Sequence, residues 1–234
     1  MNVGSFGNSR PRARNIFGAA PGAAEPGASE PGAADLGAAE PAAGPRLVWR
    51  AVGIGSGFSS PAIAGGTIFI TGNIDDATVI TALDINGRPK WQAKNGPAYR
   101  NNKPGTRSTP TIDARRNRIY IGTGQNLSHP TTDTSDAVIA LDMDSGELVW
   151  RFQATAQDAW NAACLNDGPN CPENAGGDFD FGASIILAEL SDGRELLLAG
   201  QKSGDVWALD PDPVGGDGEV VWTTRVSHAA IGPN

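Results

Sequence analysis

The sequence predicts an all-β body that follows a segment with no core of its own, and three observations support this. From residue 47 onward, short runs of β-branched and small apolar residues alternate with Gly, Asp and Asn turns. No stretch has a 3.6-residue apolar period long enough for a core helix. A unit of Ala-Leu-Asp, a glycine-containing turn and a final Trp recurs along the same part of the chain.

Residues 1–45 differ in composition from the rest of the chain. "GAAPGAAEPGASEPGAADLGAAEPAAGP" cycles Gly, Ala, Pro and acidic residues, and it offers too little apolar surface to offset the entropy of ordering a backbone. We therefore expect a disordered tail over residues 1–45 and a single β domain over residues 46–234. The first residues contain no apolar run of the length that a secretory signal needs, so no signal peptide is visible in this chain.

Five stretches of the β domain have the composition of strands or hairpins. Each joins an apolar run to a turn that contains Gly, Asp or Asn. These stretches are "AIAGGTIFITG" (62–72), "DATVITALDING" (76–87), "TIDARRNRIYIGTG" (111–124), "DAVIALDMDSG" (136–146) and "ELLLAGQKSGDVWALD" (195–210).

The repeat is the strongest signal in the sequence. Trp91, Trp150 and Trp222 end three copies of the unit, and Trp49 in "GPRLVW" is a possible fourth end. The unit measures about 40 residues plus insertions that grow along the chain, which is the size of a four-stranded propeller blade. We expect the Asp of each unit to bond the amides of its turn and each Trp to pack across the neighbouring blade. The Asp residues in question are Asp84, Asp142 and Asp210.

Charge and hydropathy exclude two classes of partner. The chain has 26 acidic and 18 basic residues, for a net charge of −8, and no dense stripe of Lys and Arg that could follow a phosphate backbone. No run of apolar residues reaches the length of a membrane span. The sequence therefore predicts neither nucleic-acid binding nor a transmembrane segment.

The two cysteines suit a structural role. Cys164 and Cys171 flank "LNDGPN", a turn-rich segment that can bring their Cα atoms within bridging range. Two cysteines without a neighbouring His make a poor zinc site, and no Cys-x-x-Cys-His motif is present for a haem. We predict a disulfide within this loop.

The Ala-Leu-Asp, turn, Gly, Trp unit resembles the tryptophan-docking repeat of pyrroloquinoline quinone (PQQ) propellers, and the resemblance covers residues 47–227. Within it, residues 121–226 are most similar to the polyvinyl-alcohol-dehydrogenase-like quinoproteins. "TSDAVIALDMDSGELVW", "NCPENAGGDFDFGAS" and "LLLAGQKSGDVWALDPD" carry this likeness. The resemblance implies a partial propeller of about four four-stranded blades out of eight.

The same resemblance implies a set of partners for the chain. PQQ and calcium would be its cofactors. A small-molecule or polymeric alcohol would be its substrate, and an external acceptor would take the electrons. The resemblance also implies a periplasmic location.

Four residues fall at or next to positions that bind the cofactor or its metal in this family, although Arg107 and Gln125 depart from the residue types that the family usually has there. Lys202 in "GQKSG" falls where quinone dehydrogenases have a Lys or Arg on the cofactor's carbonyl oxygens, and a cation there would stabilise developing negative charge. Arg107 in "GTRSTPTID" falls where many relatives stack a Trp on the cofactor, and a guanidinium can also stack. Gln125 and Asn126 in "GTGQN" lie at a calcium-ligand position. The alternatives are a solvated turn lysine for Lys202 and a turn cap for Asn126.

The loop that begins "DAWNAAC" departs from the family pattern at the general base. Quinone dehydrogenases commonly have Asp-x-Trp-Asp there, with the second Asp as the base, whereas this chain has Asp158, Ala159, Trp160 and Asn161. An amide cannot accept a proton at neutral pH. We therefore expect Asn161 to contact the cofactor and Asp158 to act as the base, with Asp178 or Asp180 of "GGDFDFG" as the alternatives.

The sequence leaves more than one functional class open. The first is a PQQ-dependent alcohol dehydrogenase-like oxidoreductase fragment, which oxidises a hydroxyl group by base-assisted hydride transfer to PQQ. The second is a non-catalytic β-propeller scaffold for protein–protein interaction, which would bind no quinone and would tolerate both Asn161 and Arg107. A third is a truncated or hybrid gene product without activity of its own. Uptake of quinone with calcium discriminates the first class from the others.

Overall fold

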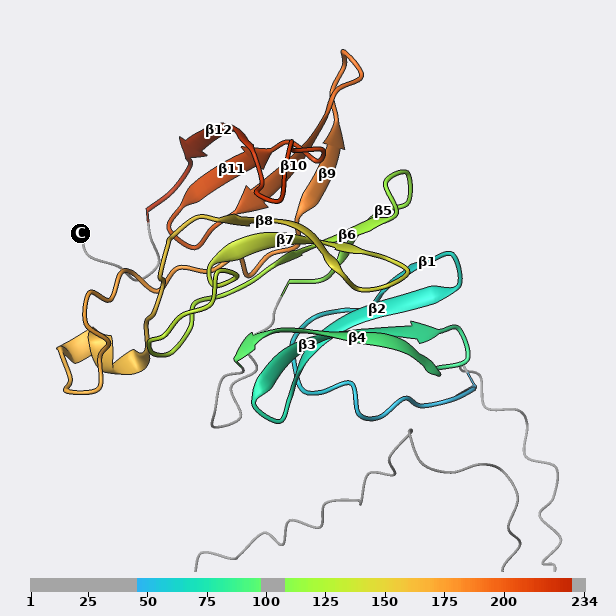
Figure 1. Cartoon of the computed structure of the whole chain (residues 1–234), viewed down its shortest axis with the longest axis horizontal. Coiled ribbons are helices and arrows are strands. Elements are labelled where there is room, and N and C mark those ends of the chain that lie inside the picture. The colour runs from blue at the N-terminus through green and yellow to red at the C-terminus, as the bar shows by residue number, and fades with distance from the viewer. Residues whose placement is uncertain (1–45, 98–107, 229–234) are drawn as a thin grey trace, which may run out of the picture. The chain divides into compact units, whose positions relative to one another are not determined.

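The computed structural model describes residues 46–97 and 108–228, and the strands of these residues form three four-stranded antiparallel sheets (Figure 1). The chain divides into two units, residues 1–53 and 54–234, and every strand of the described residues lies in the second unit. The described part of the first unit, residues 46–53, contains no strand. The structure thus shows three complete blades, and the tail expected over residues 1–45 lies outside the described residues.

Each sheet is a simple meander in which strands adjacent in sequence are also adjacent in space. The first sheet contains β1 (Ala62–Ala64), β2 (Thr67–Ile74), β3 (Ala77–Asp84) and β4 (Pro89–Pro97). The second contains β5 (Thr111–Asp113), β6 (Arg118–Gly122), β7 (Ala137–Asp142) and β8 (Leu148–Gln153). The third contains β9 (Ile186–Glu189), β10 (Glu195–Gly200), β11 (Asp205–Leu209) and β12 (Val220–Arg225). This arrangement confirms the predicted all-β fold and the blade size of its repeat.

The only helical element among residues 46–97 and 108–228 is a short 3₁₀ helix, η1 (Ala162–Asn166). It lies in the long connection between β8 and β9, which is the insertion that contains both cysteines. No helix in the described part of the chain is long and apolar enough to cross a bilayer.

The core consists of two apolar clusters, one on each side of the middle sheet. On one side, Ile119 and Ile139 pack with Phe69 of the first sheet. On the other, Tyr120 and Val138 pack with residues of the third sheet. Side chains alternate between the two faces of a strand, so a strand that is covered on both faces needs an almost unbroken apolar run. "RIYIG" and "AVIALD" of β6 and β7 are runs of this kind.

The repeated tryptophans join neighbouring blades, as predicted. Trp91 donates from its Nε1 to the carbonyl of Met143 in the turn after β7 of the second blade, at 3.0 Å. Trp150 donates in the same way to the carbonyl of Pro211 in the turn after β11 of the third blade, at 3.3 Å. Trp222 occupies the equivalent position on β12 and is 41% exposed. Each Trp pairs in register with the Ala of an Ala-Leu-Asp unit, the pairs being Ala82 with Trp91, Ala140 with Trp150 and Ala208 with Trp222.

The Asp of each repeat bonds its own turn, which also confirms the prediction. Asp142 Oδ1 accepts from the backbone N–H groups of Asp144 and Ser145, and these bonds help to lower the pKa of Asp142. Asp84 and Asp210 accept equivalent bonds from the turns that follow them. The aspartates are therefore local structural residues that fix the tight reversal before each Trp strand.

Candidate functional site

Lys202 and Asp178 form the centre of the candidate site. Lys202 lies in the turn between β10 and β11, and Asp178 lies in the connection between β8 and β9. The Lys202 Nζ forms an ion pair with Asp178 Oδ2. The other carboxylate oxygen, Oδ1, accepts from Gln125 Nε2 at 2.8 Å. Three residues singled out in the sequence therefore meet here, from three separate segments.

The ion pair is largely enclosed by protein. Asp178 is 6% exposed, and the side chain of Lys202 is 24% exposed. The backbone N–H of Lys202 also donates to the carbonyl of Asp180 at 2.9 Å, so both segments are fixed against each other. A hydrogen-bonded ion pair with low exposure is strong, and removal of one partner leaves an uncompensated charge.

Asp158, the base expected from the sequence, is buried beside this pair. It is 2% exposed, and neither of its carboxylate oxygens has a hydrogen-bond partner among the described residues. Burial, together with the negative charges of Asp136, Asp178 and Asp180, raises the pKa of Asp158 to about 8. At pH 7 this carboxyl is therefore mostly protonated, and a protonated carboxyl cannot accept a substrate proton.

Gln125 and Asn126, the expected calcium ligands, differ in what their side chains contact. Asn126 Oδ1 accepts from the backbone N–H of Thr132 at 2.6 Å and from its hydroxyl at 3.3 Å, so Asn126 caps a turn. Gln125 Oε1 is buried and has no partner in the described part of the chain. Of the two amide oxygens, that of Gln125 is the one available to a ligand.

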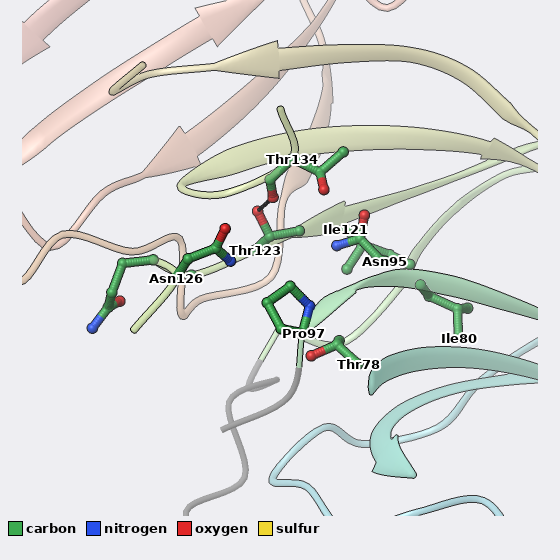
Figure 2. A pocket seen from close by; sticks show the side chains of 10 residues that line it. Thr78, Ile80, Asn95, Pro97, Ile121, Thr123, Asn126 and Thr134 are labelled. Atoms are coloured by element: carbon green, nitrogen blue, oxygen red, sulfur yellow. Dashed lines mark hydrogen bonds between the residues drawn. The ribbon is translucent and has the colours of Figure 1, made fainter. Parts of the chain in front are cut away.

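Gln125 and Asn126 line a small cavity between the first two sheets, which Figure 2 shows. Its volume is about 30 Å³, enough for one water molecule. Thr123 and Thr134 lie at its edge, where the Thr123 hydroxyl donates to the Thr134 carbonyl at 2.7 Å, and Pro97 of β4 lies opposite them (Figure 2). The cavity borders the Gln125 side of the site.

Asn161 uses all of its amide atoms in hydrogen bonds to its own loop and to the β6–β7 connection. Its Nδ2 donates to the carbonyls of Leu127, at 3.0 Å, and Asn170, at 2.9 Å. Its Oδ1 accepts from the backbone N–H of Ala163 at 2.9 Å and thereby caps η1. The predicted disulfide between Cys164 and Cys171 is present and closes the same loop. Arg107 lies outside the described residues.

Sequence reasoning missed Asp136 and Gln201. Asp136 directly precedes β7 and is fully buried, and its Oδ2 accepts from Gln201 Nε2 at 2.6 Å. The signal that could have found Asp136 is its place in "TSDAVIALD", where an acidic residue stands immediately before a strand that is buried almost throughout. Such a carboxylate needs a partner inside the protein.

The oxygen atoms of the site are of the kind that a hard cation binds. Gln125 Oε1, Asp136 Oδ1 and both oxygens of Asp158 are buried without partners in the described part of the chain. No three His, Cys, Asp or Glu residues of the described ranges converge as a metal site. A calcium ion would therefore need amide as well as carboxylate oxygens, which calcium accepts. These residues fit calcium in donor type, and Lys202 fits an oxygen-rich quinone.

Comparisons with known proteins find similar sequences among quinone-dependent dehydrogenases. Residues 58–170 match the model of the PQQ family, described as the β-propeller domain of glucose, ethanol and alcohol dehydrogenases. The polyvinylalcohol dehydrogenase of a Pseudomonas species is 37% identical over 163 residues, which cover 63% of this chain and 25% of that protein. The polyvinylalcohol dehydrogenase of Sphingopyxis sp. strain 113P3 is 37% identical over 148 residues, covering 62% of this chain and 21% of that protein.

A solved structure shows the same fold. The quinohemoprotein alcohol dehydrogenase of Comamonas testosteroni superposes with a TM-score of 0.51 at 23% sequence identity, covering 70% of this chain and 28% of that chain. The fold and the tryptophan contacts thus define three consecutive blades of a β-propeller. The chain is similar to the PQQ-repeat β-propeller proteins over residues 58–170, and it spans about a quarter of the length of the polyvinylalcohol dehydrogenases it matches.

Proposed function

We propose that this chain forms part of the quinone site of a PQQ-dependent alcohol dehydrogenase. The observation that supports this most directly is the ion pair between Lys202 and Asp178, which Gln125 extends by a hydrogen bond. It brings together a partly exposed cation, a buried carboxylate and a buried amide whose oxygen has no partner among the described residues, where the second and third blades meet.

Asp178 takes the role of the general base in this proposal. It is the carboxylate of the set that has a cationic partner, and a carboxylate can accept the proton of a substrate hydroxyl. Asp158 ranks below Asp178 as a candidate base. It holds a proton at pH 7 and could accept one from a substrate only after losing it. Bound PQQ would supply the acceptor for the hydride that leaves the substrate carbon.

Lys202 has two tasks. In the structure it compensates the charge of Asp178. With quinone present, its ammonium group would donate to a carbonyl oxygen of the cofactor, where fixed positive charge stabilises the negative charge that develops on that oxygen. Gln125 Oε1 and the oxygens of Asp158 would hold calcium.

Substrate and location follow from the relatives and from the disulfide. The relatives that match at 37% identity are named for polyvinyl alcohol, so we propose a polymeric or small alcohol as the substrate. An external acceptor would take the electrons. The disulfide between Cys164 and Cys171 supports an oxidising compartment such as the periplasm.

A non-catalytic scaffold is the competing proposal, and one observation favours it. The amide of Asn161 is fully used in bonds to its own loop and to Leu127 of the β6–β7 connection, so the loop that begins "DAWNAAC" is held in place without any cofactor. The two proposals differ in a single measurable property, which is whether the chain binds quinone.

Titration of the purified chain with PQQ, in calcium and in EDTA, tests the proposal. We expect saturable binding that depends on calcium. Lys202→Ala should weaken it by roughly 10- to 100-fold, as expected for a hydrogen bond to a charged group, and Lys202→Arg should retain much of it. Lys90→Ala is the matched control, because Lys90 bonds Thr67 in the first sheet. Absence of binding by the unmodified chain would favour the scaffold instead.

A further inference from the structure

Asp136 has a backbone that is fixed on both sides and a side chain that is wholly inside the protein. Its φ is 44°, in the left-handed region that few residues other than Gly adopt, although Asp tolerates it better than most. Its backbone N–H donates to the carbonyl of Gly124 at 2.9 Å, and its carbonyl accepts from the N–H of Ala154 at 3.0 Å. The side chain therefore projects from a rigid point, and its exposed fraction is 0%.

The carboxylate of Asp136 reaches across to the third sheet and holds Gln201. The 2.6 Å bond from Gln201 Nε2 to Asp136 Oδ2 is short because its acceptor can carry a full charge. At the other end of the same amide, Gln201 Oε1 accepts from the Ser203 hydroxyl at 2.5 Å and from Trp207 Nε1 at 3.4 Å. Both ends of the Gln201 side chain are thus fixed, and only one orientation of the amide satisfies all three partners.

Gln201 is also the first residue of the turn that presents Lys202. The turn is closed by the bond from Gln201 N–H to the Asp205 carbonyl at 2.9 Å and by the bond from Gly204 N–H to the Gln201 carbonyl at 3.0 Å. The next residue after Gln201 is Lys202, whose Nζ meets Asp178. The bonds that hold Gln201 therefore also fix the Cα of Lys202, from which its side chain extends.

We infer that Asp136 is a positioning residue, which holds the β10–β11 turn through Gln201 and thereby directs Lys202 onto Asp178. This inference rests on the proposed function for the importance of Lys202, but its geometry can be tested without any cofactor. If Asp136 only supported the core, its loss would loosen the fold as a whole. If it positions Lys202, its loss should free that lysine selectively.

Competitive amine labelling measures this directly. The unmodified chain and its variants are treated briefly with acetic anhydride, and acetylation of each lysine is quantified by mass spectrometry. Lys90 and Lys94 of β4 serve as internal references within the same molecule. In Asp136→Ala, which removes the acceptor, we expect Lys202 to label roughly tenfold faster relative to these references, the size of effect expected when a charged hydrogen bond is lost. In Asp136→Asn, which keeps an acceptor oxygen for Gln201, labelling should stay within about twofold of the unmodified chain.

A second variant keeps the test decisive if Asp136→Ala does not fold. Gln201→Met breaks the same link from the other side while it keeps the side-chain volume, so it should raise Lys202 labelling as Asp136→Ala does. Unchanged Lys202 labelling in folded Asp136→Ala or Gln201→Met would overturn the inference. So would an equal rise at all three lysines, because that result describes general loosening.

Quinone titration of the same variants links the inference to the function. Asp136→Ala should weaken quinone binding, and it should have little further effect when Lys202→Ala is already present, because the two changes act on one interaction. If the effects of Asp136→Ala and Lys202→Ala on quinone affinity were fully additive, Asp136 would not act through Lys202. If the unmodified chain bound no quinone while the labelling pattern held, the proposed function would fail and the positioning of Lys202 would stand.

Discussion

The indole ring of Trp91 lies directly against Gly146 of the neighbouring blade. A β-carbon added to Gly146 would come within 2.6 Å of Trp91 Cε3, closer than real side chains approach. A related contact occurs one blade further on, where a β-carbon on Gly218 would come 2.7 Å from Phe152 Cβ and 3.2 Å from Trp150 Cε3. The contact of Gly146 with Trp91 thus requires a Gly at position 146.

Gly146→Ala should therefore destabilise the chain through a clash as well as through its backbone. Gly146 has a φ of +76°, so any L-residue is strained there, and the indole blocks the new methyl group. We expect a loss of about 1 to 3 kcal/mol in the free energy of unfolding, measured by urea denaturation. Gly193→Ala is the control, because Gly193 has a similar φ of +83° with nothing within 4 Å. Equal losses in the two variants would show that the indole contact has no part in the effect.

Truncation of the tryptophans should have unequal costs. Trp150 is 1% exposed between two sheets, and Trp150→Ala should cost about 3 to 5 kcal/mol. Trp222 is 41% exposed on the last described strand, so Trp222→Ala should cost no more than about half as much. Urea denaturation of both variants provides the comparison. A similar cost for the two would mean that Trp222 is covered in solution.

The repeat made most of the fold predictable from the sequence. The site, in contrast, is built from long-range contacts that a repeat pattern does not reveal. Trp91 and Trp150 revealed the blades because each ends a unit of the same composition. Asp178 belongs to an insertion whose place is set by Phe181, which is 1% exposed in the core and donates its N–H to the Thr123 carbonyl at 3.0 Å. This anchoring and the bond from the Lys202 N–H to the Asp180 carbonyl bring Asp178 beside Gln125, whereas local motifs favoured Asp158.

The free energy of unfolding should decrease as the pH rises from mildly acidic to mildly basic, because the folded chain keeps a proton on Asp158 that the unfolded chain releases. Its pKa in the folded state is about 8, well above the ordinary value of 3.8, so the folded state binds this proton more tightly than the unfolded chain does. Between about pH 4 and pH 8 the free energy of unfolding therefore decreases as the pH rises. Asp136, with a pKa raised to about 6 by burial, acts in the same direction at the acidic end of this range.

Asp158→Asn should reduce this pH dependence, because the amide does not titrate. We expect the difference in unfolding free energy between pH 5 and pH 8 to shrink by about 1 to 3 kcal/mol, measured by urea denaturation in EDTA. Asp217→Asn is the control, because the side chain of Asp217 is 88% exposed. An unmodified chain that is equally stable at both pH values would contradict the buried, protonated state of Asp158.

Reduction of the disulfide should destabilise the chain and its loop. The bridge between Cys164 and Cys171 closes a short segment, for which chain entropy alone predicts a stabilisation of about 2 to 3 kcal/mol. Alkylation without reductant, followed by mass spectrometry, should find no free thiol in protein made in an oxidising compartment. The double variant Cys164→Ser/Cys171→Ser should unfold at lower urea concentration, and reductant should not shift its midpoint any further. Two alkylated thiols in the unmodified protein would show that the bridge does not form.

If the proposed dehydrogenase function holds, three substitutions in protein loaded with PQQ and calcium decide which residue is the general base. Asp178→Asn removes the carboxylate that pairs with Lys202, and it should slow alcohol-dependent reduction of the quinone by about 10²- to 10⁴-fold, the usual contribution of a general base. Asp158→Asn should slow this step far less, because Asp158 is already protonated at pH 7.

The third substitution, Asn161→Asp, restores the residue type that quinone dehydrogenases commonly have at this position. In this structure it would turn a carboxylate oxygen toward the carbonyls of Leu127 and Asn170, which now accept from the Asn161 amide. We therefore expect a loss of stability of about 1 to 3 kcal/mol and no gain in rate. The rate is read from the quinone absorbance in a single turnover, so no external electron acceptor is needed. If Asp158→Asn abolished the reaction while Asp178→Asn did not, Asp158 would be the base. If Asn161→Asp accelerated the reaction, the loop that begins "DAWNAAC" would have to open toward the substrate.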